Sequence, residues 1–200
     1  MASTAALFRV EISTALLSAV DSWPETRASL ASVAQAANRK QIASGLSLDR
    51  PGHAIWADLL PSSVPDTPRE KTEVPLPPYG QDAAIARAHR QSFDVVRFIP
   101  APNCEHFLEF TLKVQNFDVW MAAFDHEGAA QRANDGLIDE VVARGVEDPS
   151  AVHLVFLVSD PQAARSGVRS ARRLCFSPEA TVDEPPAFEF FRWTGAGAAG

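Results

Sequence analysis

The chain has 200 residues, 46% hydrophobic and 22% charged, proportions typical of a globular protein with one large or two small domains. Its formal net charge of −7 disfavours nucleic acids and anionic membranes as partners, because both bind clustered Lys and Arg. Cys104 and Cys175 are too few for a disulfide framework or a zinc cluster, and no signal peptide or membrane-spanning run is evident, so we expect a cytoplasmic protein.

The N-terminal part of the chain begins with a strand pattern and continues with a helix pattern. Residues Leu7 to Ile12 alternate apolar and charged side chains, which predicts a half-buried strand. From Asp21, a suitable N-cap, we expect a helix with Pro24 in its first turn. Gly45 is expected to end this helix, since glycine is favoured just beyond helix C-termini. Residues His53 to Leu60 then predict another strand.

Prolines dominate the next segment, residues 61–80, and exclude a helix or a central strand there. We expect a long surface loop. Residues Asp82 to Gln91 are rich in alanine and predict a short helix, followed by a buried strand from Ser92 to Phe98. The order of residue types in this strand returns in Ala187 to Trp193, near the end of the chain. Residues 100–103 are the candidate linker between two units.

The second half of the chain has the clearer pattern. Leu108 to Val114 alternate apolar and polar side chains and predict a strand, with Glu109 on its polar face. Asn116 or Asp118 caps the helix that follows, and Gly136 ends it. The further elements expected are strands at Ile138–Val146 and Val152–Val158, a helix beginning at Asp160-Pro161, and the closing strand Ala187–Trp193.

This order of elements, β-α-β-β-α-β, is that of a ferredoxin-like α+β unit. The repeated strand pattern suggests two such units in tandem. We therefore expect a degenerate N-terminal α+β unit over residues 1–100 and a C-terminal ferredoxin-like unit over residues 104–194. Trp23 would then match Trp120, Gly45 would match Gly136, and His53 would match His153, but a full second strand does not fit between Leu46 and His53.

The C-terminal half resembles the dimeric α+β barrel superfamily, and within it the antibiotic-biosynthesis-monooxygenase-like and stress-responsive barrel proteins. The resemblance rests on Glu109–Val114, Phe117-Asp118-Val119-Trp120, Phe124, Gly136-Leu137, Asp148-Pro149, Val152–Phe156, Ser159-Asp160 and Phe188–Arg192. Proteins of this superfamily pair two ferredoxin-like sheets into one barrel. The resemblance therefore implies either a monomeric pseudo-dimer, with both sheets in one chain, or a homodimer.

Motifs of the well-marked enzyme classes are missing from the sequence, including glycine-rich phosphate loops and paired metal-binding histidines. The candidate site is therefore a barrel cavity. His153, on a strand that should be buried on both faces, is either a satisfied core histidine or a general base. Trp120, Phe124 and Glu127 share a helix face and are substrate-binding candidates, although Glu127 could equally be solvated at the helix end. Arg192 could bind a carboxylate or pair with Glu109 or Glu11.

Three functions remain open. The resemblance implies a small-molecule enzyme, namely a cofactor-independent monooxygenase, isomerase or cyclase acting on an aromatic or polyketide-like substrate. A non-catalytic stress-response barrel that binds a small molecule and a protein-interaction scaffold are the alternatives. A cavity lined by Trp120, Phe124 and His153 would favour the first two. We expect no metal and no cofactor; haem, which some relatives bind, would require a histidine facing the cavity, and His153 is the candidate.

Overall fold

The computed structural model describes residues 7–60, 85–98, 104–127, 129–134, 136–174 and 187–194. The proline-rich segment 61–80, the linker 100–103 and Cys175 lie outside these residues. The elements are β1 (Phe8–Leu17), a 3-10 turn (Val20–Ser22), α1 (Trp23–Ala36), β2 (Lys40–Ser47), β3 (His53–Leu59), β4 (Ile85–Phe98), β5 (His106–Lys113), α2 (Phe117–Glu127), α3 (Ala129–Asn134), β6 (Leu137–Gly145), β7 (Ala151–Val158), α4 (Pro161–Leu174) and β8 (Ala187–Trp193).

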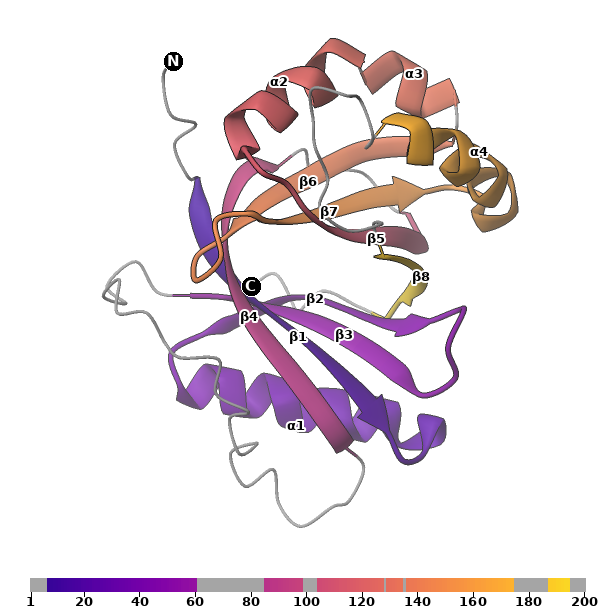
Figure 1. The fold of residues 1–200 in the computed structure, drawn as a ribbon. Helices are drawn as coiled ribbons and strands as arrows, with labels where there is room; N and C mark the ends of the chain where they lie inside the picture. The colour runs from indigo at the N-terminus through magenta and orange to yellow at the C-terminus, as the bar shows by residue number, and fades with distance from the viewer. Residues whose placement is uncertain are drawn as a thin grey trace.

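The eight strands form a closed antiparallel barrel in the order β1-β3-β2-β8-β5-β7-β6-β4. Strands β1 to β4 make one half of the wall and β5 to β8 make the other, each half having the strand order of a ferredoxin-like sheet. The helix α1 lies against the first half, while α2, α3 and α4 gather on the opposite side of the barrel (Figure 1). The expected α+β fold, with two ferredoxin-like units in one chain, is confirmed.

The two halves are related by a regular offset along the sequence. At one junction Gly45 of β2 pairs with Trp193 of β8, and at the other Ala143 of β6 pairs with Val95 of β4, so residues 98 positions apart are equivalent. Between β1 and β5 the offset is 97, because Ile12 pairs with Ala57 where Glu109 pairs with Val155. These offsets allow each residue of one half to be compared with its counterpart in the other.

Side chains on the two faces of the wall enter different cores, as strand alternation requires. The outer face of the second half packs against its helices through Leu108, Phe110, Trp120 and Phe124. The inner face forms a separate cluster that includes Val10, Phe93, Phe107 and Phe191. Both faces of these strands are therefore covered, which explains why Val152–Val158 is apolar except for His153.

The first helix is shorter than predicted, and Gly45 does not end it. The helix α1 ends at Ala36, where Arg39 N–H donates to the Ala34 carbonyl (2.8 Å) and Asn38 takes a positive φ of 55°. Asparagine tolerates this left-handed conformation and so serves as the helix C-terminal residue. Gly45 instead lies in β2, a full second strand that the sequence was not expected to contain.

A close approach between strands explains the glycine at position 45. A Cβ there would lie 2.7 Å from the Phe107 ring and 3.1 Å from the Arg192 carbonyl oxygen. The Phe107 ring is itself held, since it stacks on Phe191 with ring centroids 5.1 Å apart. Gly45 thus permits the junction between β2 and β8 to close.

The helix predicted over Asp82 to Gln91 is also wrong for its described part. Residues from Ile85 onward belong to β4, where Ala88 pairs with Ala15 and Gln91 with Ile12. Because β1 extends to Leu17, pairing along its free edge outweighs the helix propensity of the alanines.

The repeated strand pattern is not the structural repeat. Phe93 corresponds to Phe191 by the junction register, whereas the pattern would match Phe93 with Phe188. By the same offset, Gly45 corresponds to Ala143 and His53 to Ala151, so these two predicted matches are wrong. Trp23 and Trp120 do lie 97 residues apart, as the matched pair predicted, and both are buried.

Several predicted helix boundaries are confirmed. Asn116 caps α2, because its Oδ1 accepts hydrogen bonds from the backbone N–H groups of Asp118 and Val119 (3.0 and 3.1 Å). Asp160 caps α4 through Gln162 N–H (2.8 Å). Gly136 has a φ of 78°, but it follows α3; the helix that begins at Phe117 ends at Glu127, so the prediction that Gly136 ends that helix is wrong. Among the described helices, none has the length and apolarity needed to cross a bilayer.

Candidate functional site

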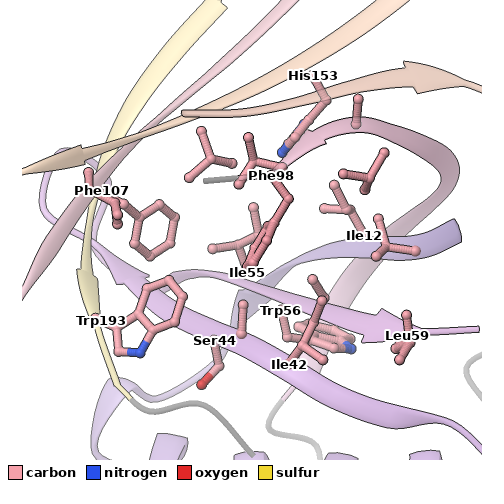
Figure 2. Close-up of a pocket in the computed structure, with 18 of the residues that line it drawn as sticks. Ile12, Ile42, Ser44, Ile55, Trp56, Leu59, Phe98, Phe107, His153 and Trp193 are labelled. Atoms are coloured by element: carbon pink, nitrogen blue, oxygen red, sulfur yellow. The ribbon is translucent and has the colours of Figure 1, made fainter. Parts of the chain in front are cut away.

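The barrel encloses an apolar cavity of about 670 Å³, a size typical of small-molecule sites. Figure 2 shows its walls, with Trp193 and Phe107 on one side and Leu59 and Ile42 on the other. Phe98, 46% exposed, lies at its rim. Among the described residues that line the cavity, the polar or titratable side chains are Ser44, Cys104 and His153.

His153 occupies the centre of β7 and faces the cavity, where a ring nitrogen points inward (Figure 2). Its side chain is 2% exposed, and the Phe93 ring packs against it with centroids 5.1 Å apart. Its Nδ1 lies 3.4 Å from Glu109 Oε1 on the neighbouring strand β5. Since Nδ1 faces Glu109, Nε2 is the nitrogen left to meet a molecule in the cavity.

Burial shifts both members of this pair toward their neutral forms. Desolvation lowers the pKa of His153 to about 4. Desolvation, followed by the negative charge of Glu189, raises the pKa of Glu109 to about 8. Near neutral pH the pair therefore holds a protonated Glu109 beside an uncharged imidazole.

Glu189 lies next to the pair formed by His153 and Glu109, toward the end of the barrel opposite Phe98. It is directly opposite Glu109 in the β5–β8 register, and both carboxyl groups are on the inner face. Its Oε1 accepts a hydrogen bond from His53 Nδ1 (2.9 Å), and Arg50 forms an ion pair with it. Despite desolvation, hydrogen bonds from His53, Arg50 and Ser47 lower the pKa of Glu189 to about 2. No three acidic, histidine or cysteine side chains of the described chain are placed to share a metal ion.

The second half of the barrel supplies Glu109, His153 and Glu189, whereas His53 and Arg50 come from the first half. By the offsets given above, the counterparts of Glu109, His153 and Glu189 in the first half are Ile12, Ile55 and Gln91. Ile12 and Ile55 line the same cavity. Glu109, His153 and Glu189 therefore have no titratable counterparts in the first half of the barrel.

Trp120 and Phe124, two of the sequence-predicted binding residues, lie outside the cavity. Both are buried between α2 and the outer face of the sheet, and their rings stack with centroids 5.1 Å apart. The Arg132 guanidinium covers the other side of Phe124, 3.9 Å from its ring centroid. This region is a filled core, whereas the cavity lies on the other side of the barrel wall.

Arg192 is not brought together with His153. Arg192 is exposed and lines a separate surface groove with Trp23 and Arg27. The side chain of Glu127 lies outside the described residues. The ion pairs expected of Arg192 with Glu109 or Glu11 are not found among the described residues, and Glu11 is paired with Arg39 and Arg90 instead.

Glu109, Glu189 and His53 were missed as site residues. Glu109 was assigned to a polar strand face, and polar faces usually meet solvent; in a closed barrel that face turns inward. One signal was present in the sequence: Glu109 and Glu189 are the acidic residues of their two strands, and these strands are neighbours in any ferredoxin-like sheet.

No protein-family model and no curated protein matches this sequence. The structure is similar to a suspected monooxygenase from Lactobacillus acidophilus, with a TM-score of 0.62 and 10% identity over 96% of this chain and 97% of the other. It is also similar to a haem-binding protein from Thermus thermophilus, with a TM-score of 0.54 and 13% identity over 93% and 90%. A ferredoxin-fold protein of Listeria monocytogenes, related to antibiotic biosynthesis monooxygenases, gives a TM-score of 0.51 and 4% identity over 96% and 97%. Together with the closed eight-stranded barrel, these similarities show that the chain has the fold of the dimeric α+β barrel superfamily, with both halves of the barrel in one polypeptide.

Proposed function

We propose that this protein binds an apolar aromatic or polyketide-like molecule in the barrel and removes a proton from it, with His153 as the general base. The observation that carries the proposal is a buried histidine facing an apolar cavity of about 670 Å³, backed by a buried carboxyl group 3.4 Å away. A proton-accepting group in a water-poor cavity is a common arrangement for acid–base catalysis.

The proposed step is a single proton transfer. Nε2 of His153 accepts a proton from an acidic O–H or C–H group of the ligand, which is left as an oxyanion or carbanion. Once Glu109 is ionised, the imidazolium that forms donates its Nδ1–H to the Glu109 carboxylate, which stabilises the positive charge. Isomerisation, cyclisation and cofactor-independent oxygenation by molecular oxygen can all begin with such an anion, so this step is common to the three activities.

The wall residues support an aromatic ligand. Phe107 and Trp193 meet edge to face at a centroid distance of 5.2 Å, and Ile12 and Ile55 complete an apolar surface. Planar rings stack favourably on such aromatic side chains. Because few polar groups line the cavity, a ligand rich in polar substituents would lose hydrogen bonds to water without replacing them.

The cavity does not fit haem, which the relative from Thermus thermophilus is named as binding. An imidazole is present at His153, but the described lining residues include no Arg or Lys to pair with the two haem propionates. Buried carboxylates without a cation are costly. We therefore propose no step that involves haem.

The probe 2-naphthol tests the proposal, because its absorption spectrum distinguishes the phenol from the phenolate. Binding should quench the fluorescence of Trp193 and Trp56, which line the cavity. Bound naphthol should ionise at a lower pH in the wild type than in His153→Asn, since His153 accepts its proton once Glu109 is ionised. In His153→Asn, binding should persist while naphthol ionises at a higher pH than in the wild type.

The matched control is His126→Asn, since His126 is exposed on α2. This variant should behave as the wild type in both measurements. Absence of quenching in the wild type would contradict small-molecule binding in the barrel. Quenching with the same ionisation in the wild type and His153→Asn would contradict a catalytic His153 and favour a non-catalytic binding barrel.

A further inference from the structure

Two buried glutamates face each other at the end of the barrel opposite its rim. Glu109 and Glu189 are direct partners in the β5–β8 register, and their side chains are 10% and 6% exposed. Directly opposite residues of an antiparallel pair have Cβ atoms about 5 Å apart. Carboxyl groups so close together in a protein interior do not both ionise readily.

The contacts around each carboxyl group decide which one carries the charge. Glu189 has three partners that favour its ionised form: Arg50, His53 and Ser47. Glu109 has only His153 as a close partner among the described residues. The negative charge therefore resides on Glu189, and the proton resides on Glu109.

The remaining charged groups at this end point elsewhere. Asp49, in the same turn as Arg50, accepts a hydrogen bond from Phe190 N–H (2.8 Å) and pairs with Arg165 of α4 (2.6 Å). The titratable or charged groups that face Glu109 are therefore His153 on β7, Glu189 on β8, and His53 and Arg50 from β3 and the turn before it.

We propose that Glu189, held by Arg50 and His53, is a positioning residue that keeps the proton on Glu109 and so controls when His153 can act as a base. This inference rests on the proposed function, and it assigns the control of the site to the end of the barrel away from the rim. A molecule approaching past Phe98 would meet His153 without touching Glu189.

The control operates through one proton. While Glu109 is protonated, it offers no negative charge to an imidazolium at His153. When Glu109 releases its proton to solvent, the resulting carboxylate accepts the Nδ1–H of His153, and Nε2 gains affinity for a ligand proton. The ligand then loses one proton and His153 gains one, so the transfer is balanced.

Two substitutions should shift the pH at which Glu109 ionises in opposite directions. Glu189→Gln removes the like charge beside Glu109, so Glu109 should ionise at a pH lower by about one unit or more. Arg50→Gln removes an opposite charge that favours ionised Glu109, so ionisation should need a higher pH. The shift should be smaller for Arg50→Gln, because the Arg50 side chain is 63% exposed. Gln91→Ala, at the position equivalent to Glu189, is the control and should shift nothing.

Each variant is measured in two ways. The first is the pH midpoint for ionisation of bound 2-naphthol, which requires the proposed function. The second is the pH at which the urea midpoint of the ligand-free protein stops falling as Glu109 ionises, which requires no ligand. Opposite shifts in the ligand-free measurement, without naphthol binding, would support the control by Glu189 and contradict the proposed function.

The inference is overturned if Glu189→Gln leaves unchanged the pH at which the urea midpoint of the ligand-free protein stops falling. It is also overturned if Glu189→Gln and Arg50→Gln shift that value in the same direction, since a merely structural role would perturb both in the same sense. Arg50 lies in an exposed turn, so its variant keeps the test decisive even if Glu189→Gln fails to fold.

Discussion

At the scale of single residues, the barrel interior keeps two titratable groups uncharged at some cost to stability. Glu109 and His153 would each be charged over part of the range between pH 4 and 8 in an unfolded chain, but folding removes them from water. Above pH 4.5 an unfolded glutamate is ionised, so keeping Glu109 neutral in the folded chain lowers the free energy of unfolding. Below pH 6.5 an unfolded histidine is protonated, so keeping His153 neutral lowers the free energy of unfolding there. These two effects have opposite dependence on pH.

The pH dependence of stability follows from these shifts. The raised pKa of Glu109, about 8 against 4.5, makes stability fall as pH rises from 4.5 to 8. The lowered pKa of His153, about 4 against 6.5, makes stability rise between pH 4 and 6.5. The slopes of Glu109 and His153 cancel between pH 4.5 and 6.5, and the fall that remains below pH 6 comes from Asp58, whose pKa desolvation raises to about 6. From pH 6.5 to 8 the free energy of unfolding should fall by ~2 kcal/mol, at about 1.4 kcal/mol per pH unit.

Urea unfolding across this pH range checks the prediction. Glu109→Gln should abolish the fall above pH 6.5, because an amide does not ionise. Glu25→Gln, an exposed position in the first turn of α1, should retain it. A fall of equal size in Glu109→Gln and the wild type would show that another group is responsible.

The sequence suggested His153 as a candidate but not the residues that lie beside it in the structure, for reasons that are specific to each residue. A histidine inside the apolar run Val152–Val158 is conspicuous in the sequence. Glu109 sits in a regular alternation, where a polar residue predicts a solvent-facing side chain, and only the closed barrel turns it inward. His53 begins its strand and gave no sign that Glu189, 136 residues away, would be its partner.

At the scale of elements, the barrel is closed by two junctions of unequal length. The β2–β8 junction has three residue pairs, and the β4–β6 junction has five. The shorter junction contains Gly45, and its closeness to Phe107 and Arg192 limits what this position can hold. The β2–β8 junction should therefore be the more sensitive of the two to substitution.

Gly45→Ala tests this sensitivity. The added methyl group would overlap the Phe107 ring, which is 3% exposed and stacked on Phe191, so it cannot easily move away. Overpacking of this kind costs about 1–3 kcal/mol. Thermal unfolding should show a lowered Tm, whereas Lys40→Ala, at the exposed start of β2, should have little effect. An unchanged Tm in Gly45→Ala would mean that the junction opens without cost.

The elements that were predicted correctly are those whose patterns are local. The strands from Leu108, Val152 and Ala187 and the capped helices at Asn116 and Asp160 needed no distant partner to be recognised. β2 and the first half of β4 were missed because their sequences, rich in alanine, serine and glutamine, favour no element strongly. Pairing with β3 and with β1 makes them strands.

At the scale of the whole molecule, one chain supplies both halves of a barrel that encloses one cavity. Residues of both halves line it, with Ile12 and Ile55 from the first and Phe107 and His153 from the second. The set Glu109, His153 and Glu189 is present once per chain. Its counterparts in the first half are Ile12, Ile55 and Gln91. The binding stoichiometry should follow from this arrangement.

We expect one 2-naphthol molecule bound per chain. Native mass spectrometry should show a single adduct, and isothermal titration calorimetry should give the same ratio. Ile55→Trp, which fills the cavity from the first half, should abolish the adduct although His153 is untouched. Two equivalent adducts per chain would contradict a shared cavity.

The difference between the two walls also bears on regioselectivity. A barrel with exact two-fold symmetry would accept a ligand in two orientations of equal energy, and each end of the molecule would meet a base equally often. Here one orientation places an acidic group against His153, and the reversed orientation places it against Ile55. Deprotonation should therefore occur at one defined position of an unsymmetrical ligand, and the products formed should be a single regioisomer.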